Sequence, residues 1–233
     1  MSGRGVVVGV VAVVVLASGV VVADRVAHAT AERRVSEAIE QNLDVVGTPA
    51  VDIGGFPFLT QLLAGSVDDV TGSVDGITLE GVDATEVTID ARDVTVSEPY
   101  TVGTATIGAT LPTASIEQIV RERSNLDVAV AVDEGALAAS GDLLGMTLSA
   151  DLTPRVEEGR LLVSVENVRI AGLTVSVEDL PSAIGDRLTD IKIPLSGLPE
   201  GLVLSDATVA GDGVRITATG TDVVLPTQAP DAR

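Results

Sequence analysis

The chain has 233 residues, 45% hydrophobic but only 1% aromatic, which is enough aliphatic material for one domain or two small ones. Its 34 acidic and 14 basic residues give a net charge of −20, which repels nucleic-acid phosphates and argues against a nucleic-acid partner. There is no cysteine and a single histidine, His28. This inventory excludes disulfides, a thiolate nucleophile, a Cys/His zinc cluster and a serine triad.

The first 23 residues predict a membrane segment. Residues 6–23 are uncharged and mostly valine, and Arg4 precedes them. As a helix they would be about 27 Å long, close to the roughly 30 Å hydrocarbon core of a bilayer. We expect a signal-anchor or a signal peptide cleaved after Ala23; the run exceeds the usual apolar core of a signal peptide, which favours the anchor. Arg4 and the amino terminus favour a cytoplasmic N-terminus, with the rest of the chain outside the cytoplasm.

Residues 24–43 predict an amphipathic helix that ends before Thr48 and Pro49. Its apolar residues fall on one helical stripe, made of Val35, Ala38, Ile39 and Leu43. Charged residues occupy the other faces, a pattern typical of solvated surface. We interpret His28, near the start of this helix, as an exposed or interfacial residue rather than a metal ligand.

Beyond residue 65, apolar residues alternate with polar ones at every second position, which predicts β-strands. The alternation is clearest at Val87, Ile89 and Ala91 and at Val128, Val130 and Val132. Asp, Glu and Gly residues at 75–76, 133–135, 157–159 and 211–213 predict tight turns, and hence antiparallel hairpins. The clearest hairpin joins residues 146–156 to residues 161–170.

Two further helices are predicted within this strand-rich region. One covers residues 116–123, with Ser115 and Gln118 as a capping box, and the other covers residues 180–188. Further strands are expected near residues 191–195, 202–209 and 214–219. Together these elements predict one β-rich α+β domain over residues 24–225, followed by a disordered tail at residues 226–233.

The sequence offers little for catalysis. It contains no P-loop, no GxSxG nucleophile elbow and no dinucleotide fingerprint. The acidic pairs Asp68/Asp69 and Asp83/Glu86 lack the spacing of a calcium loop, so we interpret them as solvated acids. We therefore predict no enzymatic activity, no metal and no cofactor.

Residues 55–61, with the sequence GFPFLTQ, contain both phenylalanines of the chain. Two interpretations are open. Phe56 and Phe58 can plug one end of the core, because aromatic rings bury a large apolar area. Alternatively they line the mouth of an apolar cavity or insert into a membrane leaflet, with Pro57 fixing the turn between them.

This GFPFLTQ string, preceded by a helix that begins Ala23-Asp24-Arg25 and followed by residues 62–65 (LLAG), resembles the LmeA-type phospholipid-binding family of actinobacteria. The resemblance extends through residues 198–202 (LPEGL) and the strand near residue 214, and so covers residues 24–225. It implies a fold similar to the tubular lipid-binding (BPI-like) proteins. In that fold a strongly curved antiparallel sheet wraps a long helix and leaves an apolar groove for acyl chains. It also implies phospholipid binding in the cell envelope.

From the resemblance and the aliphatic composition we expect an extracytoplasmic, membrane-associated protein that binds phospholipid or another acyl-chain lipid. It would act as a carrier, chaperone or presenter in cell-envelope assembly, on the outer side of the plasma membrane, with enzymes of envelope biosynthesis as candidate partners. Phe56, Pro57 and Phe58 are the candidate groove end or membrane-facing lip. The candidate wall residues are Leu59, Leu62, Leu63, Val35, Ile39 and Leu43.

Two alternatives stay open from the sequence. One is a non-enzymatic scaffold that recruits envelope-building partners through its acidic surface and holds no lipid. The other is a carboxylate-based hydrolase, which requires a close acid pair in a cleft.

Overall fold

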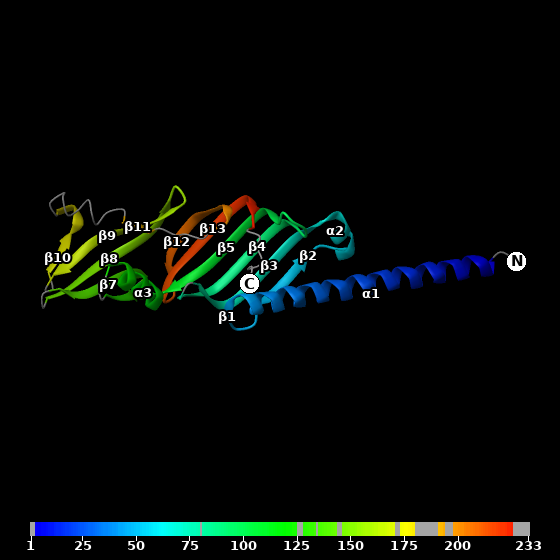
Figure 1. The fold of residues 1–233 in the computed structure, drawn as a ribbon, viewed down its shortest axis with the longest axis horizontal. Coiled ribbons are helices and arrows are strands. Elements are labelled where there is room, and N and C mark those ends of the chain that lie inside the picture. The colour runs from blue at the N-terminus through cyan, green and yellow to red at the C-terminus, as the bar shows by residue number, and fades with distance from the viewer. Residues whose placement is uncertain are drawn as a thin grey trace, which may run out of the picture.

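The molecule is elongated, with strands along its length and a long helix that projects from one end (Figure 1). The computed structural model describes residues 3–79, 81–124, 128–133, 135–143, 146–170, 173–179, 191–193 and 198–225, and the side chains of the first helix from Val21 on. The helical elements are α1 (Gly3–Asn42), α2 (Phe58–Ala64), α3 (Thr113–Ser124) and the short 3-10 helix η1 (Val177–Asp179). The strands are β1 (Asp44–Val46), β2 (Ala50–Gly54), β3 (Ser66–Leu79), β4 (Val82–Thr95), β5 (Thr101–Pro112), β6 (Ala129–Asp133), β7 (Ala136–Leu143), β8 (Met146–Glu157), β9 (Arg160–Ile170), β10 (Leu173–Ser176), β11 (Ile191–Ile193), β12 (Glu200–Ala210) and β13 (Gly213–Val224).

The strands form two sheets, here named sheet A and sheet B. Sheet A has the order β1-β3-β4-β5-β13-β12, and β2 also pairs with β3; sheet B has the order β10-β9-β8-β7-β6, and β11 pairs with β9. Every strand pairing among the described residues is antiparallel, which confirms the predicted antiparallel, sheet-rich α+β fold. The strands are divided between two sheets instead of forming one, because β12 ends sheet A and lies against β8 and β9 of sheet B.

The main hydrophobic core joins the two sheets. Leu137 and Leu161 from sheet B pack in one cluster with Leu202, Leu204 and Val214 from sheet A. Burial of large aliphatic side chains at this junction stabilises the molecule by about 1.5–3 kcal/mol per residue, so the sheets hold together without shared strand pairing. Both sheets therefore belong to one folded unit.

Helix α3 bridges the junction. The Glu117 carboxylate accepts a hydrogen bond from the backbone N–H of Val130 in β6 at 2.7 Å. The Ser115 hydroxyl donates to the carbonyl of Asp83 at 2.8 Å, and the Gln118 amide donates to the carbonyl of Gly81 at 3.0 Å. The predicted capping box is therefore wrong: α3 begins three residues earlier, at Thr113, and both side chains instead bind backbone carbonyls at or just before the start of β4.

In sheet A, the alternation of side chains between the two faces is interrupted at the same level on three neighbouring strands, β4, β5 and β13. Val102 and Ala105 of β5 both enter the same core although they are three residues apart. At this level Asp93 of β4 and Asp222 of β13 have positive φ angles of 54° and 51°. Such local irregularities bend and twist strands, so they give sheet A part of its curvature.

The predicted turns are mostly confirmed. Hairpins turn at Gly135, Gly159 and Gly211, whose φ angles are 82°, 72° and 56°. The turn predicted at residues 75–76 is wrong, because β3 continues to Leu79 and Gly76 pairs with Thr85. A Cβ atom at Gly76 would lie 3.0 Å from the carbonyl oxygen of Ala84, so this glycine allows close strand packing and makes no turn.

The helix predicted at residues 24–43 is confirmed as the C-terminal half of α1, which begins at Gly3 and ends at Asn42, but Val35, Ala38 and Leu43 of its predicted apolar stripe are exposed. Over the part of the chain that the structure describes, no helix was found that is long and apolar enough to cross a membrane. The predicted helix at residues 180–188 and the tail at residues 226–233 lie outside the described residues.

The junction core predicts a stability difference between two leucines. Leu137 is 2% exposed, whereas Leu173 in β10 is 73% exposed. We expect Leu137→Ala to lower the free energy of unfolding by about 2–5 kcal/mol, because it leaves a cavity. Leu173→Ala should change it by less than about 0.5 kcal/mol. Urea unfolding followed by far-ultraviolet circular dichroism measures both, and equal midpoints would show that the junction is not a packed core.

Candidate functional site

Three side chains at four-residue intervals fix α1 to the rest of the molecule. The carboxylate of Asp24, which is buried, accepts a hydrogen bond from the backbone N–H of Leu59 at 2.8 Å. His28 Nε2 donates to the backbone carbonyl of Ile53, and the Glu32 carboxylate accepts from the N–H of Ile53 at 3.1 Å. We call Asp24, His28 and Glu32 the α1 clamp. His28 is thus held between α1 and β2, as the interfacial interpretation predicts. The interpretation as solvated surface is wrong for Glu32 and is confirmed for the exposed residues of the next turns, Arg33, Arg34, Glu37 and Glu40.

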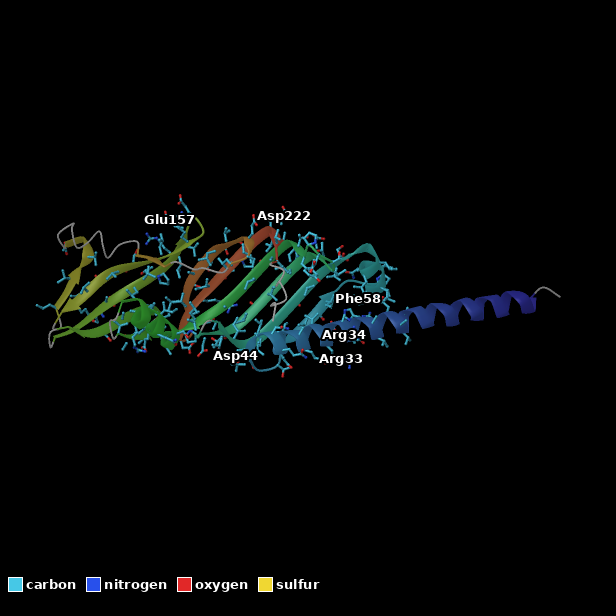
Figure 2. The ribbon with its side chains drawn as sticks, in the orientation of Figure 1. Arg33, Arg34, Asp44, Phe58, Glu157 and Asp222 are labelled. Atoms are coloured by element: carbon cyan, nitrogen blue, oxygen red, sulfur yellow. The ribbon has the colours of Figure 1, made fainter. Side chains whose placement is uncertain are left out.

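Phe58 fills the space beside the clamp. It is 1% exposed and packs with Ile53 and Val67 against Ala27 and Ala31 of α1. Its ring meets the His28 ring edge to face, with 5.3 Å between the centroids. Figure 2 shows Phe58, at the start of α2, on the side that faces α1. Phe58 therefore closes the interface between α1 and sheet A at this end, as the core-plug interpretation predicts.

The other GFPFLTQ residues shape the same corner of the fold. The buried Gln61 amide donates to the carbonyl of Gly54 at 3.2 Å and accepts from the N–H of Asp68 at 2.7 Å. Gly55 has a φ angle of +88°, and a Cβ atom there would lie 2.4 Å from Gln61 Nε2. Gly65, with a φ angle of +87°, ends α2 in the left-handed conformation. The motif is explained by the way it joins β2, α2 and β3.

Further along α1, the helix and sheet A separate and leave an apolar groove of about 220 Å³. Ile39 of α1 and Leu43, the residue directly after α1, form one wall. The opposite wall is the inner face of sheet A, with Val74, Ile77, Val87, Ile89 and Ile107. Ser73 and Thr88 are the polar side chains among the groove residues, and none of these residues is charged.

Ile89 shows how open this groove is. It lies on β4, inside sheet A, yet 40% of it is exposed. Leu43, across the groove at the end of α1, is also exposed. Gly72 on β3 lies opposite Ile89 in the strand register, and a Cβ atom at Gly72 would lie 2.8 Å from Ile89 Cγ2. The glycine therefore provides room for the isoleucine on the floor of the groove.

The predicted lipid-contacting residues fall into separate groups. Ile39 and Leu43 line the groove, and Val35 is exposed one helical turn before Ile39. Phe58 is the plug. Five residues lie at α2: Phe56, Pro57, Leu62 and Leu63 are exposed, and Leu59 is half-buried.

Sequence reasoning missed most of the groove wall on the sheet. Ile77 and Ile107 were not among the candidates, and Val87 and Ile89 were identified as strand residues only. Ile77, three residues after Val74 on β3, falls outside the period-two alternation. This alternation marks the shared face of Val87, Ile89 and Ile107. It does not show that α1 leaves this face partly uncovered.

The acidic pairs noted in the sequence take part in local polar contacts. Asp69 forms an ion pair with Arg92 at 3.5 Å, and Asp83 accepts a hydrogen bond from the Thr78 hydroxyl at 2.6 Å. Glu86 accepts from the Thr110 hydroxyl at 3.0 Å. Among the described residues, no group of three or more His, Cys, Asp or Glu side chains could hold a metal ion.

The two phenylalanines predict different effects on stability. We expect Phe58→Ala to lower the free energy of unfolding by about 3–5 kcal/mol, because it empties a fully packed site. Phe56 is 57% exposed and contacts the Arg25 guanidinium, whose carbon lies 5.3 Å from the ring centroid. Phe56→Ala should therefore cost at most about 1 kcal/mol. Urea unfolding compares the two variants, and a larger effect at Phe56 would contradict the assignment of Phe58 as the plug.

Comparison with known proteins supplies the family. No curated protein and no solved structure was found to match the chain. A family model described as LmeA-like phospholipid-binding matches residues 22–219. The matched range begins next to Asp24, the first residue of the α1 clamp, and ends within β13, so it includes the plug and both walls of the groove. The chain belongs to the LmeA-like phospholipid-binding family.

Proposed function

We propose that the groove between α1 and sheet A binds an acyl chain of a phospholipid, and that the protein is a non-enzymatic carrier, chaperone or presenter of lipid. The observation that carries this proposal is the pair of facing apolar surfaces, with Ile89 and Leu43 both exposed, in a member of a phospholipid-binding family. The arrangement of α1 along the inner face of sheet A supports a fold of the tubular lipid-binding (BPI-like) type.

The hydrophobic effect is sufficient for retention. Each methylene removed from water contributes about 0.8 kcal/mol, so a 16-carbon chain gains on the order of 10 kcal/mol before ordering costs. The groove volume of about 220 Å³ is below the roughly 300–1,000 Å³ of typical ligand pockets. A complete chain therefore extends beyond the groove or displaces the Leu43 end of α1. The uncharged lining leaves the polar headgroup outside.

The fixation of α1 at one end supports such a displacement. The α1 clamp and Phe58 hold the helix near Asp24, whereas Ile39 is half-buried and Leu43 is exposed. Opening the groove at Leu43 therefore breaks fewer buried contacts than opening it at Phe58. Segments that move for ligand binding are generally those with few buried contacts.

We place the protein at the cell envelope. In this proposal residues 1–23 are a single-pass anchor, or a signal cleaved after Ala23, and residues 24–225 are the lipid-binding domain on the outer side of the plasma membrane. Along α1, Ile39 lies about 22 Å from Asp24 at the usual helical rise. A lipid in the groove would therefore be lifted away from the bilayer, which suits presentation to an enzyme of envelope biosynthesis.

One substitution on the floor of the groove tests lipid binding. The wild-type domain without the N-terminal segment, residues 24–233, purified without detergent from an actinobacterial host, should carry phospholipid at near-stoichiometric occupancy. Ile89→Glu should reduce this occupancy at least about tenfold, because an uncompensated buried charge costs more than 1.4 kcal/mol. Native mass spectrometry with solvent extraction measures the bound lipid.

Thr104→Glu is the matched control. Thr104 is exposed, and it lies beside Arg92 in the strand register of sheet A. This variant introduces the same charge away from the groove lining and should retain wild-type occupancy. An empty wild-type protein that also takes up no lipid from vesicles would contradict the proposal, as would equal occupancy in both variants.

A further inference from the structure

A second apolar surface lies away from the groove, at α2. Phe56, Leu62 and Leu63 are exposed there, and Leu63 is 88% exposed, the largest value among the exposed large hydrophobic residues. We call these three residues the α2 tip. Val22 and Val26 are exposed on the turns of α1 next to Asp24, which binds Leu59 of α2. Neither a packed core nor the groove accounts for these side chains.

The α2 tip is also free of acidic residues. Residues 53–67 contain no charged residue, although the chain carries 34 Asp and Glu. On the neighbouring turn of α1, Asp24 is buried and binds the backbone of α2. Arg25 is exposed, and its guanidinium lies over the Phe56 ring. The α2 tip therefore presents apolar side chains and a cation in a strongly acidic chain, and an exposed acid, Asp68, lies beside it, 3.1 Å from where a Cβ atom at Gly55 would be.

The course of α1 identifies what this surface faces. α2 lies at the end of sheet A from which α1 projects (Figure 1). The same helix continues through residues 6–20, which are uncharged in the sequence. Val22 and Val26 lie one on each side of Asp24 and about 6 Å apart along the helix axis, so both are close to the turn of α1 that contacts α2. Apolar groups of interfacial helices reach roughly 5–10 Å into a bilayer, so a bilayer that holds residues 6–23 would lie within reach of α2.

We propose that the α2 tip is a second membrane contact, in which Phe56, Leu62 and Leu63 insert into the outer leaflet beside the N-terminal segment. This inference rests on the proposed function only for the membrane location of residues 6–23. Two contacts on different elements fix the orientation of the domain, whereas one helix alone would let the domain rotate about its axis. The Leu43 end of the groove then points away from the bilayer.

The absence of native cysteine allows a direct test with single labelled positions. Full-length Leu63→Cys and Leu173→Cys variants, each carrying an environment-sensitive NBD label, are reconstituted into phosphatidylcholine vesicles with or without 5-doxyl phosphatidylcholine. Leu173 is the matched control, because it is an exposed leucine in β10, at the other end of the molecule (Figure 1). We expect a blue shift and doxyl quenching at position 63 and neither at position 173.

The other outcomes overturn the proposal in distinguishable ways. If the protein floats with the vesicles but the label at position 63 is not quenched, the N-terminal segment inserts and the α2 tip does not. A blue shift without doxyl quenching would assign the tip to a protein contact, and quenching at both positions would indicate unspecific adsorption. If the protein does not float, the anchor and the tip contact both fail. Lipid extracted from the purified protein before reconstitution reports on the groove separately.

Discussion

The hydrogen bonds between α1 and the backbone of β2 and α2 are the constraint on which the rest of the structure depends. Asp24 is buried, and a buried carboxylate without a partner would be strongly destabilising, so its bond to the Leu59 N–H places α1 and α2 relative to each other. His28 and Glu32 bind both backbone polar groups of Ile53 and set the position of the helix along β2. With α1 fixed here and Phe58 filling the space beneath it, the helix leaves the groove open only further along.

The GFPFLTQ motif is therefore explained mainly by the contacts that hold the fold together. The sequence also allowed a direct functional explanation, in which the motif lines a cavity or enters a membrane. Phe58 and Gln61 are buried and hold β2, α2 and β3 together, while Gly55 makes space for the Gln61 side chain. The groove walls consist of common aliphatic residues, which occur in many unrelated sequences. The string on which the sequence resemblance rests thus marks the closed end of the interface, and the surface best suited to acyl chains has no comparable signature.

Much of the fold could be predicted from local patterns, because hairpins depend on alternation and on turn residues close in the sequence. The turn predicted at residues 75–76 and the capping box at Ser115 failed because the partners of Gly76 and Ser115 are distant: Gly76 packs closely on Ala84, and Ser115 binds the carbonyl of Asp83. The division into two sheets depends on where β12 meets β8, which alternation does not encode.

The candidate site was predictable in its α1 half only. Ile39 and Leu43 follow from helical periodicity, whereas the wall at Ile89 and Ile107 depends on the register of three strands and on the angle at which α1 leaves the sheet. His28 and Glu32 look like ordinary polar helix positions, because their partner is the backbone of Ile53 and backbone groups leave no trace in the sequence.

Net charge adds a last constraint on how such a protein approaches its lipid. At −20 the chain is repelled by anionic lipid surfaces, and this repulsion acts over about a Debye length, roughly 8 Å at physiological salt. The α2 tip, which has no acidic residue of its own, is then the apolar part of the domain suited to approach such a surface, with the exposed Asp68 beside it. In the proposed membrane-bound state, the α1 clamp, which joins this tip to the closed end of the groove, would also set the direction of the groove relative to the membrane.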